Sequence, residues 1–85
     1  IDIFLRDNKG WKIVDCKRYS QPVGDEHLVK LHGRATSSQW KKKMPVPVIV
    51  TTVGFTAPAR KFARENGVQI YTFDQLLELA TKMIT

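Results

Sequence analysis

Two short segments in which apolar and polar residues alternate lie near the start of the chain, only a few residues apart. Residues 1–5 and 11–19 carry strand-forming types in this pattern, and Asp7, Asn8, Lys9 and Gly10 between them are all turn formers. A period of two is typical of strands that present one face to a core and the other to solvent. The pattern therefore predicts a β-hairpin, which limits the chain to folds built around a sheet.

After the hairpin, helical and strand patterns alternate. A helix beginning at Gly24 or Asp25 is expected to end near Ser38, with Leu28 and Leu31 on its apolar face. A polar connector over residues 39–47 precedes a strand at 48–52, a helix capped by Thr56, a strand at 68–71 and a helix that opens with a Thr72–Gln75 capping box. The order β-β-α-β-α-β-α predicts an α/β fold with a mixed sheet and helices packed on it.

Composition narrows the class of protein. The chain has 85 residues, which suit one domain, and 14 Lys and Arg against 8 Asp and Glu give a formal net charge of +6. This excess points to nucleic acid first and to an anionic membrane surface second, although an ordinary solvated basic surface is the simpler alternative. The apolar run at 46–50 is too short to span a bilayer. A single cysteine, Cys16, forms no internal disulfide, so we expect a cytoplasmic protein; Cys16 itself is expected in the core.

The hairpin brings two acids together. With Asp7–Gly10 as its loop, Phe4 pairs with Ile13 and Asp2 with Asp15, and Lys17 shares the face of Asp15. Opposed carboxylates repel, so a divalent cation such as Mg²⁺ is one way to hold them together, with Lys17 acting on a water or on a phosphate. The alternative is a solvated face on which Lys17 forms a weak salt bridge with one of the acids.

These residues also resemble a known family. Asp2 followed by the segment DCKRYSQPVG of residues 15–24, the Gly54-Phe55-Thr56 corner and the late Asn66-Gly67-Val68 segment are similar to Mrr-like restriction endonucleases of the PD-(D/E)xK superfamily. The resemblance implies a restriction-endonuclease-like mixed sheet flanked by helices. It also implies a single domain over residues 1–85 that lacks the family's usual first helix and strand, and that belongs to a longer protein.

The same resemblance implies an activity, which is Mg²⁺-dependent hydrolysis of DNA phosphodiester bonds, with Mn²⁺ as a possible substitute. Asp2, Asp15 and Lys17 match the catalytic positions, and Asp2, Asp15 and the backbone carbonyl of Cys16 match the metal ligands. Cleavage of both strands favours a homodimer. Three alternatives are a non-catalytic DNA-binding or assembly module, a nuclease like the Holliday-junction resolvases, and a structural domain with an incidental acid pair.

Basic and polar side chains around the hairpin and the first helix are the candidate DNA contacts. Such contacts position nucleic acid without reading its sequence. These residues are Arg18, Tyr19, Gln21, Lys30, Arg34, Lys41, Lys42 and Lys43. Trp40, beside three lysines, either stacks on a base or packs over the edge of the sheet.

Overall fold

The computed structural model describes residues 2–40 and 42–84, without the side chains of Asp2, Asp7, Gln39, Leu79, Ala80 and residues 82–84. The elements are β1 (Asp2–Asp7), β2 (Gly10–Lys17), α1 (Asp25–Ala35), a 3₁₀ turn η1 (Ser38–Trp40), β3 (Val46–Thr51), α2 (Ala57–Asn66), β4 (Gln69–Thr72) and α3 (Phe73–Ile84). The predicted order of strands and helices is confirmed, with η1 as an addition.

The hairpin has the predicted register. β1 and β2 are antiparallel, and Asp2 lies opposite Asp15 and Phe4 opposite Ile13. Its loop is tighter than expected, because Asp7 and Gly10 already pair and only two residues lie outside the ladder. Gly10 makes this possible with a φ of 126°, a backbone conformation that residues with a side chain rarely adopt.

The four strands form one mixed sheet in the order β1-β2-β3-β4, in which β3 runs parallel to both β2 and β4. The predicted connector over residues 39–47 is too long, because β3 already begins at Val46. Pro47 is tolerated in this strand because it pairs with Ile13 of β2, whereas the pairing with β4 starts one residue later. Its missing N–H therefore costs no bond to β4.

Local side-chain bonds set the ends of the helices. α1 ends at Ala35, earlier than predicted, and the Thr36 hydroxyl donates to the His32 carbonyl at 2.9 Å. Thr56 caps α2 by accepting from the Ala59 N–H at 3.2 Å. The predicted capping box of α3 is confirmed by reciprocal bonds of Thr72 and Gln75, at 2.9 and 3.2 Å.

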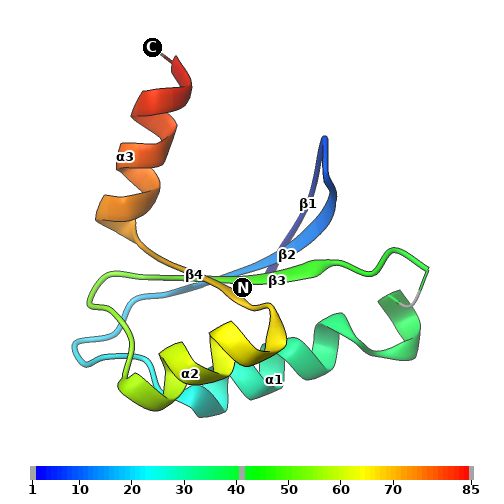
Figure 1. Ribbon diagram of the computed structural model, residues 1–85, viewed down its shortest axis with the longest axis horizontal. Helices are drawn as coiled ribbons and strands as arrows, with labels where there is room; N and C mark the ends of the chain where they lie inside the picture. The colour runs from blue at the N-terminus through cyan, green and yellow to red at the C-terminus, as the bar shows by residue number, and fades with distance from the viewer. Residues whose placement is uncertain (1, 41, 85) are drawn as a thin grey trace.

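The core lies between one face of the sheet and two helices. Figure 1 shows α1 and α2 together on one side of the sheet, while α3 extends from the other side. Leu28 and Leu31 of α1, Ile49 of β3 and Ala59 of α2 have no exposed surface. Each large aliphatic side chain buried in this way contributes about 1.5–3 kcal/mol. This packing fixes α1 against α2 and β3, on the same face of the sheet as Asp15, so that Arg34 of α1 comes within reach of the Asp15 carboxylate.

The expectation that Cys16 belongs to the core is wrong, because its side chain is exposed. Cys16 alternates with Asp15 along β2 and so faces away from α1 and α2. On that side α3 packs mainly against β4 and β3, and Ile3 of β1 is 45% exposed. The sheet thus buries only one face of its hairpin.

Candidate active site

The acid pair is positioned by the hairpin register. Asp2 and Asp15 are direct partners across β1 and β2, an arrangement in which Cβ atoms lie about 4.5–5.5 Å apart. The Asp2 side chain lies outside the described part, so its predicted role stays a prediction. Asp15 and Lys17 are separated by one residue on β2 and share the face that α1 covers.

Asp15 is buried, and two cations meet one of its oxygens. Its side chain is 3% exposed, with Oδ2 lying 3.2 Å from Lys17 Nζ and 3.6 Å from Arg34 Nη2. The predicted ion pair of Lys17 is therefore present, but the face is not solvated as the simpler interpretation expected. Low solvent exposure strengthens these interactions, and both partners offset the cost of burying the carboxylate.

Among the described residues, no group donates a hydrogen bond to the second oxygen of this carboxylate. Asp15 Oδ1 is buried and unpaired, which is unusual for a charged oxygen and is the kind of atom that a bound cation satisfies. Mg²⁺ prefers oxygen ligands and takes one or two carboxylates along with water and phosphate. The donor set of Asp15, the opposed Asp2 and backbone carbonyls therefore fits this ion. The described residues hold no cluster of three or more His, Cys, Asp and Glu side chains suited to a metal.

Two contributors to the site escaped the sequence argument. Arg34 was predicted to contact DNA, but it also forms an ion pair with Asp15. Its position on α1 between the buried Leu31 and Ala35 could have indicated that it lies near the sheet. Thr51 lies opposite Lys17 in the β2–β3 register, has no exposed surface, and its hydroxyl has no partner. A polar residue ending an apolar, β-branched strand was the available signal for Thr51.

The loop after β2 gathers one group of the predicted DNA contacts. Arg18, Tyr19 and Gln21 line a shared hollow of about 460 Å³ together with His27. Lys17 Nζ lies 5.9 Å from the centre of the Tyr19 ring, within range of a cation–π contact. Tyr19 therefore links this hollow to the lysine that pairs with Asp15.

A second group lies along α1 and the segment that follows it. Lys30 and Arg34, one helical turn apart, line a larger cavity of about 920 Å³ together with Trp40. Lys42 is exposed, Lys43 lies over aromatic rings, and Lys41 lies outside the described residues. Five of the predicted contacts thus line two hollows near the acid and the lysine, whereas Lys42 and Lys43 line neither of them.

Together, the mixed sheet and the acid–lysine arrangement on its hairpin define a restriction-endonuclease-like α/β domain. Residues 1–80 match the family model Mrr_cat, described as "Restriction endonuclease", and the chain belongs to this family. No curated protein and no solved structure matches the chain at the significance required. Within residues 2–40 and 42–84, no helix is long and apolar enough to cross a membrane.

Proposed function

We propose that this domain is a Mg²⁺-dependent endonuclease that hydrolyses DNA phosphodiester bonds. The observation that carries the proposal is the buried, unpaired Oδ1 of Asp15, on a carboxylate whose other oxygen lies 3.2 Å from Lys17 Nζ. The register that places Asp2 opposite Asp15 supports it, as does membership of a restriction endonuclease family. The reducing state expected for the Cys16 thiol fits a cytoplasmic enzyme.

Each residue has a chemical role in the proposed hydrolysis. A water oxygen attacks phosphorus, one P–O ester bond breaks, and the leaving oxygen takes a proton. Asp2, Asp15 and the Cys16 carbonyl would hold Mg²⁺, which supplies a Lewis acid for the phosphate oxygens and lowers the pKa of water. The Lys17 ammonium orients the water and stabilises the negative charge that develops on the phosphoryl oxygens.

DNA is the proposed substrate because cations surround the site. The chain carries a net charge of +6, and Lys30, Arg34 and Arg18 line the two hollows beside Asp15 and Lys17. Phosphate contacts of this kind supply affinity that falls with salt. We expect a homodimer where both strands are cut, since each domain carries one such site.

A non-catalytic DNA-binding module is the second candidate, and the burial of Asp15 favours it. The Asp15 side chain is 3% exposed and pairs with Arg34, so a substrate phosphate meets a carboxylate that is almost fully covered in this conformation. The Arg34 side chain is 48% exposed, so it has room to turn toward a substrate phosphate. The buried Oδ1, which accepts no hydrogen bond from the described residues, supports the nuclease, because a bound cation would satisfy it.

A nicking assay tests the proposal. Supercoiled plasmid is incubated with Mg²⁺ or Mn²⁺ and with wild type, Asp15→Asn or Lys17→Met, and Lys61→Met on the exposed surface of α2 is the matched control. We expect cleavage to fall by about 10²-fold or more in the two site variants, the size seen when one transition-state donor is removed. Equal nicking by all four proteins would show a contaminant and overturn the proposal.

A second measurement separates the two candidates. Mg²⁺ that binds the folded state raises the melting temperature by mass action, and Asp15→Asn should lose this shift. Salt-dependent DNA binding without any cleavage or Mg²⁺ shift is the result expected of the non-catalytic module.

A further inference from the structure

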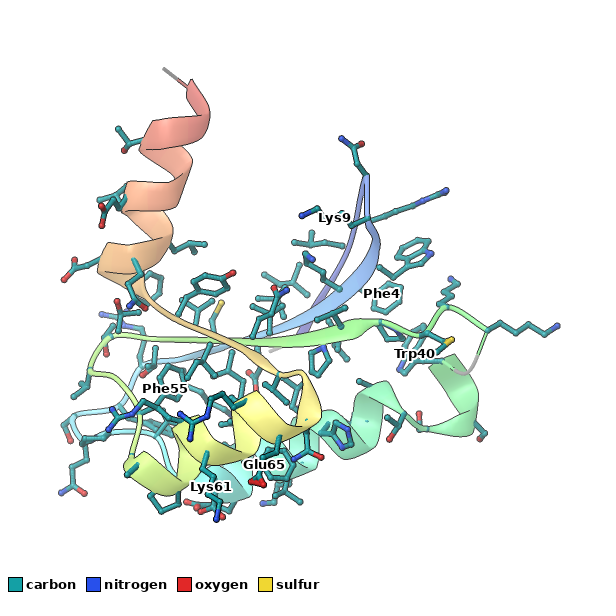
Figure 2. The ribbon with its side chains drawn as sticks, viewed as in Figure 1. Phe4, Lys9, Trp40, Phe55, Lys61 and Glu65 are labelled. Atoms are coloured by element: carbon teal, nitrogen blue, oxygen red, sulfur yellow. The ribbon has the colours of Figure 1, made fainter. Side chains whose placement is uncertain are left out.

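Three aromatic rings form a continuous stack beside the proposed active site. Phe4 of β1 is the middle ring, with its centroid 4.8 Å from that of Trp11 on β2 and 4.4 Å from that of Trp40 in η1. Interplanar angles of 25° and 24° show that the rings are nearly parallel. Figure 2 shows Phe4 and Trp40 close together beside the sheet. Offset stacking of this kind is favourable between aromatic rings and equally available to a nucleobase.

Two cationic side chains lie within cation–π distance of this stack. Lys43 Nζ lies 4.5 Å from the centre of the Trp11 ring and 5.4 Å from that of Phe4, and Arg6 Cζ lies 5.7 Å from that of Trp11. The other end of the stack opens on the cavity of about 920 Å³, where Trp40 and Phe4 form part of the wall with Lys30 and Arg34. The described residues that line the cavity include no acid.

The cavity adjoins the acid pair. Phe4 and Ile13, which both line it, are the next pair on the same face after Asp2 and Asp15, about 7 Å further along the hairpin. Arg34 belongs to both places, since it lines the cavity and lies 3.6 Å from Asp15. A strand whose phosphate lies at Asp15 therefore has a neighbouring nucleotide within reach of the cavity.

We propose that this cavity takes an unpaired nucleotide of the DNA strand being cut, with the base stacked on Trp40, the end ring of the stack, and its phosphate beside Lys30 and Arg34. This inference rests on the proposed nuclease function and names its substrate class. In an intact duplex the base faces are already stacked, so only a single-stranded, branched or flipped nucleotide offers one to a protein ring. The volume lies within the range of sites that hold a small ligand.

Binding without metal tests the inference separately from cleavage. Fluorescein-labelled single-stranded DNA and the matching duplex are titrated in EDTA with wild type, Trp40→Ala, Trp40→Phe and Gly33→Leu. Gly33 lines the cavity, and a Cβ added there meets no heavy atom within 4 Å, so leucine fills the cavity from a helix position that accepts it. Lys61→Ala and Glu65→Ala, both on the exposed surface of α2 and outside the cavity lining, are the controls.

We expect Trp40→Ala and Gly33→Leu to bind the single strand about tenfold more weakly, the size of one lost base–ring stack. Trp40→Phe, both controls and all duplex affinities should stay close to wild type. If Gly33→Leu folds, by circular dichroism, and binds the single strand as tightly as wild type, the inference is wrong. The binding experiment is done in EDTA and so does not depend on cleavage. If wild type fails to nick plasmid but shows this binding pattern, the nuclease proposal is wrong and the cavity still binds an unpaired nucleotide.

Discussion

Arg34 of α1 forms an ion pair with Asp15 of β2, with 3.6 Å between Arg34 Nη2 and Asp15 Oδ2. The two side chains differ sharply in environment, since that of Arg34 is 48% exposed and that of Asp15 is 3% exposed. A surface guanidinium thus holds a helix over a buried acid. The contact compensates part of the charge of Asp15.

Removing this contact should destabilise the fold. Arg34→Met keeps the aliphatic length of the side chain but leaves the buried carboxylate with Lys17 alone. We expect the free energy of unfolding to fall by about 1 kcal/mol, the upper end of the range for an ion pair with an exposed partner, because the other partner here is buried. Urea denaturation measures it. Lys30→Met, one turn earlier on the same helix and exposed, is the matched control, and an equal loss in both variants would contradict the assignment.

The backbone arrangement of the acid pair was predictable because a hairpin has few alternatives. A shift of one residue between β1 and β2 would turn Phe4 and Ile13 away from the core, so the apolar pattern fixed the pairing of Asp2 with Asp15. The helix caps at Thr56 and Thr72 were predictable for a similar reason, since each depends on residues three positions apart.

What lay around Asp15 was not predictable in the same way. Its burial depends on where α1 packs, and its pairing with Arg34 joins residues on separate elements that no local pattern relates. The exposure of Cys16 was missed because alternation tells which residues share a face and not which face is covered.

The exposed position of Cys16 predicts a reactive thiol. In the folded protein it should react with a thiol reagent such as DTNB at a rate comparable with that of the denatured chain, because its side chain is exposed among the described residues. Absorbance at the thiolate product band follows the reaction, and Cys16→Ala provides the blank. A thiol that reacts only after unfolding would show that another segment or a second copy covers this side chain.

Gly33 should be replaceable with a gain in stability. It lies inside α1, and an added Cβ meets no heavy atom within 4 Å. Gly33→Ala should therefore raise the free energy of unfolding by about 0.4–1 kcal/mol by reducing the freedom of the unfolded chain. Gly67→Ala is the opposite control: Gly67 ends α2 with a φ of 70°, so alanine is strained there and should lower stability. Thermal denaturation measures the melting temperatures of both variants. If both melting temperatures rise, or both fall, relative to wild type, the prediction is wrong.

Thr51 offers a test of the unpaired hydroxyl next to Lys17. The side chain has no exposed surface and its Oγ1 has no hydrogen-bond partner, so it bears the cost of desolvation without compensation. Thr51→Val keeps the shape and removes the hydroxyl, and we expect the free energy of unfolding to rise by about 1 kcal/mol. Thr56→Val makes the same chemical change where the hydroxyl caps α2, so it should cost about 1 kcal/mol instead. Denaturant titrations compare the two, and a loss of stability in Thr51→Val would mean that its hydroxyl has a hydrogen-bond partner outside the described residues, which would contradict the prediction.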